Sequence, residues 1–198
     1  MAGLHLYLRL RLDGRRAAGV EFVRGGRVQF AEARIETVLA AGSIGSTQIL
    51  QLSGIGPAPL LRKHGIAVAH ELPGVGENLQ DHLQLRMGFK VQNVLTLNKL
   101  ANSWIGKAKM ALEYALFRTG PLTMAPSQLG GFTRSSPEHA TPNIEYHVQP
   151  LTLDKFGDPL HDFPAFTASV CNLRPTSRGH IRIKSGDFRD APEIQPNY

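Results

Sequence analysis

Two short segments of the chain combine residue types that can hold a dinucleotide. Residues 40–43, Ala-Ala-Gly-Ser, end an apolar run, and small residues at such a place let a ligand approach the backbone closely. In residues 72–82, proline and glycine predict a tightly turned loop on which Asn78, Asp81 and His82 present hydrogen-bond donors and acceptors together. The first segment is thus compatible with a dinucleotide close to the backbone, and the second gathers polar groups that can contact a ligand.

Each segment also has an ordinary structural interpretation. An isolated Ala-Ala-Gly is more often a plain turn from strand to helix, and Asn78 and Asp81 can satisfy backbone groups of their own loop. Neither segment contains a complete dinucleotide fingerprint, because residues 74–79 begin as Gly-x-Gly but carry Leu79 at the place of the third glycine. The main contact with the cofactor's phosphates is therefore expected elsewhere.

A third polar group lies in the second half of the chain. Alternation in residues 143–149 places Glu145 and His147 on one face of a predicted strand, where they can line a pocket for a small polar substrate. An ordinary solvated face explains the same alternation equally well. Residues 122–129, which include Gln128, are expected near this pocket, and they hold no carboxylate for a quaternary ammonium substrate.

Other chemistries have little support in the sequence. The eight histidines form no His-Glu-x-x-His motif and no Cys/His pairing, so no metal site is predicted, and no Gly-x-Ser-x-Gly motif indicates a hydrolase. Cys171 alternates within residues 165–173 and is predicted to be a small core residue. A single cysteine excludes an internal disulfide and is consistent with a reducing compartment, so we predict a cytoplasmic protein.

Composition sets wider bounds. The 198 residues, 42% of them hydrophobic, suffice for one large domain or two small ones. A formal net charge of +6 raises the possibility of a nucleic-acid partner, but the basic residues are scattered and are not interleaved with stacking aromatic residues, so no such partner is predicted. No apolar stretch is long enough for a transmembrane helix.

Local patterns predict the elements that position these residues. Alternating residues separated by Asp13-Gly14 and Gly25-Gly26 predict a three-stranded antiparallel meander over residues 4–12, 17–24 and 27–33. The apolar run 35–40 predicts a buried strand, and Ser46 is expected to cap a helix over residues 47–52. The remaining predicted elements are helices at 59–64 and 98–118 and strands at 66–68, 128–134, 143–151, 165–173 and 180–184.

Residues 38–82 resemble the second signature of the glucose–methanol–choline (GMC) family of FAD-dependent alcohol oxidoreductases. Ser-Ile-Gly-Ser-Thr-Gln-Ile-Leu-Gln-Leu-Ser-Gly-Ile-Gly-Pro at 43–57 matches the family pattern at nearly every position, with Thr47 in place of the usual Pro or Ser. Pro-Gly-Val-Gly-Glu-Asn-Leu-Gln-Asp-His at 73–82 matches a loop that lies near the flavin in this family. Residues 130–132, 142–147 and 174–184 resemble the substrate domain of the choline-dehydrogenase-like branch.

The resemblance implies an α/β fold with much antiparallel sheet. Residues 1–82 would form the last part of a two-dinucleotide FAD-binding domain with a β-meander, without its Gly-x-Gly-x-x-Gly, and residues 83–198 an incomplete, mostly antiparallel substrate domain. The implied FAD-binding residues are Ala41, Gly42, Ser43, Asn78, Leu79 and His82, and the implied substrate-pocket residues are Gln128, Glu145 and His147.

The implied activity is oxidation of a primary alcohol, the expected small-molecule partner, to an aldehyde, with hydride transfer to FAD. The family's catalytic histidine is expected beyond Tyr198, so no catalytic residue is assigned, and the isolated chain is predicted to be inactive. A competing hypothesis is that the chain is a non-catalytic remnant that acts, if at all, as a folding or partner-binding module.

Overall fold

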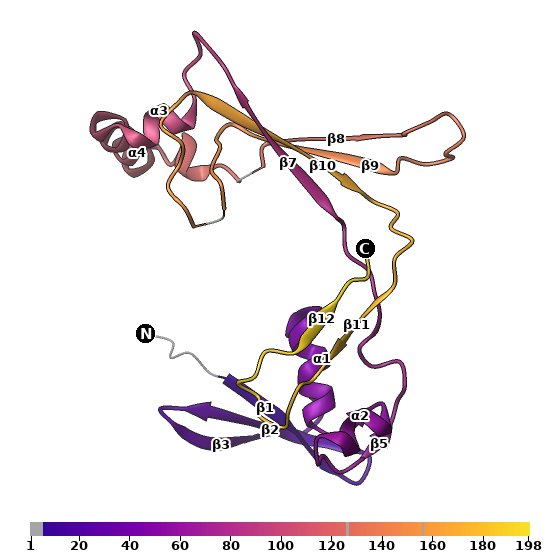
Figure 1. Cartoon of the computed structure of the whole chain (residues 1–198). Helices are drawn as coiled ribbons and strands as arrows, with labels where there is room; N and C mark the ends of the chain where they lie inside the picture. Colours follow the sequence, from indigo (N-terminus) through magenta and orange to yellow (C-terminus); the bar gives the residue numbers. More distant parts are fainter. Residues whose placement is uncertain (1–5, 126, 156) are drawn as a thin grey trace. The chain divides into compact units, whose positions relative to one another are not determined.

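The computed structural model of the chain describes residues 6–125, 127–155 and 157–198 (Figure 1). The chain divides into two compact units: unit 1 consists of residues up to Asp81 together with Thr176–Tyr198, and unit 2 consists of His82–Pro175. The sequence analysis placed the boundary after His82 and assigned everything beyond it to the second domain. The structure instead returns residues 176–198 to unit 1, because they pair there with a strand of the first segment.

Unit 1 opens with the predicted meander. Strands β1 (Leu6–Asp13), β2 (Arg16–Arg24) and β3 (Arg27–Glu32) pair antiparallel in the order β1-β2-β3. The turns between them contain Gly14, Gly25 and Gly26, at φ of 57°, 58° and 75°. This left-handed backbone favours glycine, as two-residue hairpin turns require, so the local sequence fixes the strand order.

Short elements after the meander build the core of unit 1. They are α1 (Gly42–Leu52), β4 (Ile55–Gly56), α2 (Ala58–Lys63) and β5 (His70–Glu71), the last pairing parallel with β4. A second antiparallel sheet, in the order β12-β11-β6, joins β6 (Glu77–Leu79) to β11 (Gly179–Arg182) and β12 (Glu193–Gln195). Leu52, Leu61 and Ile183 form the buried cluster between these elements, so the core needs both segments of unit 1.

The buried strand predicted for residues 35–40 is wrong. These residues are irregular, and Ile35 and Val38 are 91% and 79% exposed. A strand needs a neighbour to accept its backbone hydrogen bonds, and no strand among the described residues pairs with this segment. The strand predicted at residues 66–68 is also displaced, because pairing with β4 occurs at β5 instead.

Unit 2 is built on a four-stranded antiparallel sheet. Its order is β7-β10-β9-β8, and its strands are β7 (Gln84–Lys90), β8 (Leu129–Thr133), β9 (Ile144–Gln149) and β10 (Ala165–Asn172). The last three lie where the sequence predicted strands, so the mixed α/β class with mainly antiparallel sheets is confirmed.

The predicted helix over residues 98–118 is interrupted. The structure has α3 (Leu97–Asn102) and α4 (Trp104–Phe117), and the 3-10 turn η1 (Pro121–Thr123) follows. Ser103 separates the helices with an extended backbone, and its hydroxyl caps α4 by accepting a hydrogen bond from the Gly106 amide at 3.3 Å. Apolar spacing alone cannot reveal this break, because the capping serine keeps the helical period on both sides.

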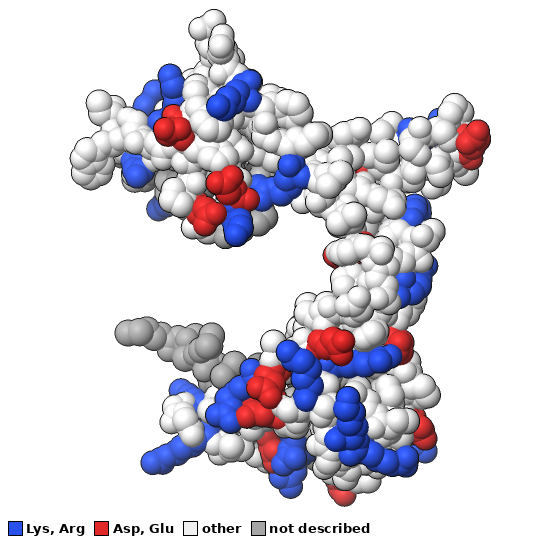
Figure 2. Space-filling view, viewed as in Figure 1, with Lys and Arg blue, Asp and Glu red and all other residues white. Residues whose placement is uncertain are grey.

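Charged side chains of both signs are mixed on the face of unit 1 that Figure 2 shows. Lys and Arg lie beside Asp and Glu there, without a large block of one sign. In the described part of the chain, no helix combines the length and the apolarity needed to cross a bilayer.

Replacing Asn98 by leucine is expected to lower the free energy of unfolding of unit 2 by about 3 kcal/mol. Asn98 is fully buried; its amide donates to the carbonyls of Thr152 (3.1 Å) and His161 (2.9 Å) and accepts from the Thr152 amide at 2.8 Å. Leucine leaves the Thr152 amide buried without a partner and removes one of the two hydrogen bonds that each carbonyl accepts, since the Thr152 carbonyl also accepts from the His161 amide and the His161 carbonyl from Asn102. Urea unfolding followed by circular dichroism measures the loss, and the matched control is Asn102→Ala.

Asn102 is exposed and donates to the carbonyls of Leu160 and His161, which water can reach once the side chain is gone. We expect Asn102→Ala to cost less than about 1 kcal/mol. Equal losses for the two substitutions would show that burial of the Asn98 amide does not stabilise unit 2.

Glu21 is expected to make unit 1 less stable in acid. Arg11 donates a hydrogen bond to the buried Glu21 at 2.6 Å, and this bond is the largest cause that lowers the pKa of Glu21. Burial acts in the opposite direction and raises this pKa, whereas Arg9 lowers it further. A carboxyl whose pKa is lower in the folded state stabilises the fold above its unfolded pKa of about 4.3, and this contribution is lost as the pH falls through the folded value.

The expected contribution of Glu21 at pH 7 is about 1 kcal/mol, since both arginines are half exposed. Urea unfolding of wild type and Glu21→Gln at pH 7 and pH 3 measures it. The difference between them should be present at pH 7 and shrink at pH 3, whereas the exposed control Glu32→Gln should stay near wild type at both. A difference that persists at pH 3 would contradict the role of this carboxylate.

Candidate functional site

A groove of about 660 Å³ in unit 1 is lined by both segments that the sequence singled out. One wall is the first half of α1, and the other is the loop that leads into β6. The lining residues that the sequence predicted for cofactor binding are Gly42, Ser43, Asn78 and Leu79. Two segments about thirty residues apart in sequence thus meet at one hollow, as expected of a shared ligand site.

The helix end at this groove is free to meet a ligand. Helix α1 begins at Gly42, where φ is 74°, with Ala41 as its N-cap residue and no side-chain cap. No acidic residue lies in the first turn. Apart from the adjoining residues and the helix backbone, nothing in the described part of the chain lies within 4 Å of the position that a Cβ on Gly42 would take. Backbone N–H groups at a helix start attract anionic groups and carbonyl oxygens, so this end suits a phosphate or an oxygen-rich ring.

The sequence analysis placed the start of this helix five residues too late, at residue 47 instead of Gly42. Ser46 lies inside α1, and its hydroxyl accepts a hydrogen bond from the Ala41 amide at 3.1 Å instead of capping residue 47 and its successors. Thr47, at the position where the GMC pattern has Pro or Ser, donates its hydroxyl to the Ser43 carbonyl at 2.8 Å. The first turn is therefore held by local hydroxyls, and its outer face stays open.

The opposite wall depends on a glycine turn. Gly76 has a φ of 89°, and its carbonyl accepts a hydrogen bond from the Ile181 amide of β11 at 2.7 Å. A Cβ there would lie 2.2 Å from the Ile181 carbonyl oxygen, so only glycine permits this approach. The turn delivers Asn78 to the groove in a left-handed conformation, at φ 63°, exposed and without a side-chain hydrogen-bond partner in the described chain.

Gln51 is the supporting residue that the sequence analysis missed. It is fully buried, and its amide nitrogen donates to the carbonyls of Val75 (3.2 Å) and Ile181 (3.0 Å). Its oxygen accepts from the Ile183 amide at 2.9 Å. One side chain of α1 therefore holds the glycine turn against β11. A polar residue inside the apolar run Ile-Leu-Gln-Leu was the available signal.

Asp81 has a partner outside its loop. The hydroxyl of Tyr198 donates a hydrogen bond to the Asp81 carboxylate, and this bond is the main cause that raises the pKa of Tyr198. The alternative that Asp81 only satisfies backbone groups of its own loop therefore does not describe this conformation. The contact joins the end of the loop to the last residue of the chain.

The other predicted site residues lie in unit 2. Glu145 and His147 follow each other on one face of β9, with Glu145 Oε1 3.2 Å from His147 Nε2. Cys171 of β10 lies directly across from Glu145, and its Sγ is 3.6 Å from Glu145 Oε2. Burial, reinforced by the charge of Glu145, raises the pKa of the Cys171 thiol, which is only 4% exposed as expected of a core residue.

His82 and Gln128 complete the predicted set. His82 belongs to unit 2 and lies near Glu145 and Cys171, rather than among the groove residues of unit 1. Gln128 is exposed and precedes β8, and its backbone amide donates to the Val148 carbonyl at 3.1 Å. Within the predicted pocket segment 122–129, residue 126 lies outside the described residues.

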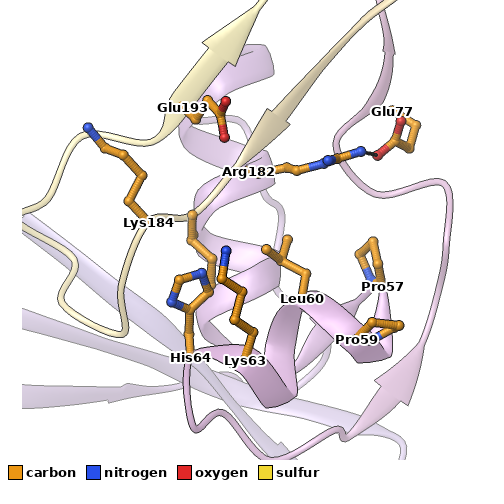
Figure 3. Close-up of a pocket in the computed structure, with 10 residues that line it drawn as sticks. Pro57, Pro59, Leu60, Lys63, His64, Glu77, Arg182, Lys184 and Glu193 are labelled. Carbon is orange, nitrogen blue, oxygen red and sulfur yellow. Dashed lines mark hydrogen bonds and ion pairs between the residues drawn. The ribbon is translucent and has the colours of Figure 1, made fainter.

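Figure 3 shows a second pocket of unit 1, of about 510 Å³, that contains none of the cofactor or substrate residues predicted from the sequence. Its lining includes Lys63 at the end of α2, His64 directly after α2, and Lys184 in the segment after β11. Arg182 reaches across to Glu77, with 3.0 Å between Nη2 and Oε1. Because Glu193 also lines the pocket, charges of both signs are present, and we assign no ligand to it.

Comparison with known proteins gives a consistent result. Residues 7–84 match the model of a family described as GMC oxidoreductase. The chain is 40% identical over 190 residues to the oxygen-dependent choline dehydrogenase of Pectobacterium atrosepticum and 42% identical over 192 residues to that of Serratia proteamaculans. Each alignment covers 96% of this chain but only 34% of the relative, so the chain spans about a third of the length of these relatives.

Solved structures share the fold. A formate oxidase structure aligns with 98% of this chain and 39% of its own chain, at a TM-score of 0.85 and 23% identity. An FAD-dependent oxidoreductase from Chaetomium thermophilum aligns with 96% of this chain and 39% of its own chain, at a TM-score of 0.75 and 26% identity.

Proposed function

Because this chain belongs to the GMC oxidoreductase family, we propose that it forms the central part of an FAD-dependent enzyme that oxidises an alcohol. The groove between α1 and the glycine loop carries the proposal, because both family segments line it. The choline dehydrogenase relatives favour a primary alcohol, oxidised to an aldehyde, as the substrate.

The groove residues suit FAD. The uncapped start of α1 and the open space before Gly42 offer backbone N–H groups, and Asn78 offers an amide without a partner in the described chain. Ala41, Ser43 and Leu79 would complete the contact in unit 1. The assignment of His82, which lies in unit 2, to the cofactor stays a prediction from the sequence. FAD, when bound, supplies the acceptor for the hydride that leaves the alcohol carbon.

On the substrate side, we propose that Glu145, His147 and Gln128 line the alcohol pocket. The half-buried pair of Glu145 and His147 offers both an acceptor and a donor for a hydroxyl group. We propose that these residues orient the substrate, and we assign none of them to accept the hydroxyl proton.

The exposure of Ile35 and Val38 supports the interpretation of the chain as part of a longer enzyme. Both side chains are more than three-quarters exposed, and a further segment packed on them would remove this apolar surface from water. The competing proposal is a non-catalytic module that binds a partner through unpaired sheet edges. It predicts a monodisperse chain that does not bind flavin.

Flavin titration and a dye-reduction assay test the proposal. FAD added to the purified chain is followed by its fluorescence, with Asn78→Ala as the test variant and Glu32→Gln, in β3, as the control. We expect binding that weakens about tenfold in Asn78→Ala only, and no dye reduction with choline or other primary alcohols. Robust turnover by the isolated chain would overturn its predicted inactivity, and wild-type affinity in Asn78→Ala would exclude the groove as the flavin site.

A chimera tests the activity itself. The corresponding third of the Serratia choline dehydrogenase is replaced by this chain, so that the remaining two thirds come from the relative. A chimera that binds FAD and reduces the dye with an alcohol supports the proposed function. A folded chimera that binds FAD but oxidises none of the alcohols tested would favour the non-catalytic module.

A further inference from the structure

Three potential metal ligands converge at one end of the unit 2 sheet. They are His82, Glu145 and Cys171, and their ligand atoms all lie within 4.8 Å of one another. They come from three adjacent parts of the sheet: Cys171 from β10, Glu145 from the neighbouring β9, and His82 from the segment that enters β7 on the other side. The sequence analysis predicted no metal site. His82 and Glu145 are 63 residues apart and Glu145 and Cys171 are 26 residues apart, and such separations form no recognisable metal-binding motif.

The strand registers explain the convergence. Cys171 pairs with Glu145 on one side and with Gln84 on the other, so the Glu145 and Cys171 side chains point to the same face. His82 lies two residues before Gln84, which returns its side chain to that face. The backbone pairing of the sheet, rather than a flexible surface contact, therefore sets the spacing of the three ligands.

We propose that His82, Glu145 and Cys171 bind a divalent transition metal ion, with Zn²⁺ as the best match. Thiolate, imidazole and carboxylate are the three side-chain ligand types that zinc takes in proteins. Bond lengths of about 2.0–2.3 Å and tetrahedral angles require ligand atoms about 3.3–3.5 Å apart. Cys171 Sγ and Glu145 Oε2 are already 3.6 Å apart, and the exposed His82 can close the remaining distance by rotation.

His147 acts on this site as a positioning residue. Its Nε2 lies 3.2 Å from Glu145 Oε1, the carboxylate oxygen that does not face Cys171. One oxygen of Glu145 is thus held by His147, and the other is presented to the ion. Partners of this kind fix the orientation of a ligating carboxylate, and their loss typically weakens metal binding about 10- to 100-fold.

Titration of the full 198-residue chain with Co²⁺ tests the site without flavin or alcohol, so its failure would leave the proposed function untouched. We expect one Co²⁺ per chain, a near-ultraviolet absorption band from thiolate bound to cobalt, and loss of that band on addition of one equivalent of Zn²⁺. His82→Ala, Glu145→Gln and Cys171→Ser should each weaken binding at least tenfold, and the exposed control His70→Ala should bind like wild type.

Folding is monitored by circular dichroism in every variant. His82 is exposed, so His82→Ala should keep the fold even if a change at the buried Cys171 does not, and His82→Ala alone then decides the outcome. His147→Ala should keep the thiolate band but weaken binding, with partial rescue in His147→Gln. A missing thiolate band in wild type, or wild-type affinity in His82→Ala, would overturn the proposal.

Discussion

Gly76→Ala is expected to lower the free energy of unfolding of unit 1 by about 3–5 kcal/mol. Gly76 has a φ of 89°, and holding a non-glycine residue in such a backbone conformation costs about 1–3 kcal/mol. The new Cβ would also lie 2.2 Å from the Ile181 carbonyl oxygen and 2.6 Å from Gln51 Nε2. The turn must therefore move away from β11 and give up the 2.7 Å hydrogen bond from the Ile181 amide.

The measurement is urea unfolding, followed by far-ultraviolet circular dichroism. The only tryptophan, Trp104, lies in unit 2, so its fluorescence does not report on this turn. Hydrogen exchange resolved along the chain should show faster exchange in β11, with unit 2 unchanged. Because the turn carries Asn78, we also expect Gly76→Ala to weaken FAD binding, if the proposed groove is the flavin site.

Gly74 provides a matched control in the same loop. Its φ is not left-handed, and a Cβ there would meet no atom within 4 Å. Gly74→Ala should therefore change the free energy of unfolding by less than about 0.5 kcal/mol. A similar loss in both variants would mean that general loop flexibility, rather than the approach of Gly76 to β11, determines stability here.

Local sequence signals predicted those parts of the fold that depend on neighbouring residues. The meander followed from alternation and from glycine pairs at its turns, and Gly65 ends α2 with a φ of 70°. The GMC signature likewise identified Gly42 and Asn78, which the structure brings to one groove.

Features that depend on distant partners were missed or wrong. Residues 35–40 have the composition of a buried strand, but no described strand offers them backbone hydrogen bonds. The cluster of His82, Glu145 and Cys171 exists only through the registers of β7, β9 and β10. The pattern of a single sequence shows the alternation of a strand but does not show which strands pair with it. Neither the irregular backbone of residues 35–40 nor the three-residue cluster could therefore be predicted from the sequence.

Gln51→Leu is expected to destabilise unit 1 by about 4 kcal/mol. The substitution keeps the volume but removes the two hydrogen bonds donated to Val75 and Ile181 and the one accepted from Ile183. Each backbone group left buried without a partner costs about 1–3 kcal/mol, and the added apolar surface recovers part of this sum. Urea unfolding measures the loss. Gln48→Leu is the matched control, because Gln48 is only partly buried and the carbonyls to which it donates can meet water.

Gln51→Glu separates hydrogen bonding from packing. It keeps the shape and the acceptor oxygen, but at neutral pH it turns a carboxylate toward two carbonyl oxygens. Burial and these oxygens disfavour the charged form and raise the pKa of the new carboxyl, so the variant should gain stability relative to wild type as the pH falls and the carboxyl takes up a proton. A packing defect has no such pH dependence. If the deficit of Gln51→Glu is the same at pH 7 and pH 5, the glutamine does not act through its donated hydrogen bonds, and the glycine turn must be held against β11 by Gly76 and its neighbours alone.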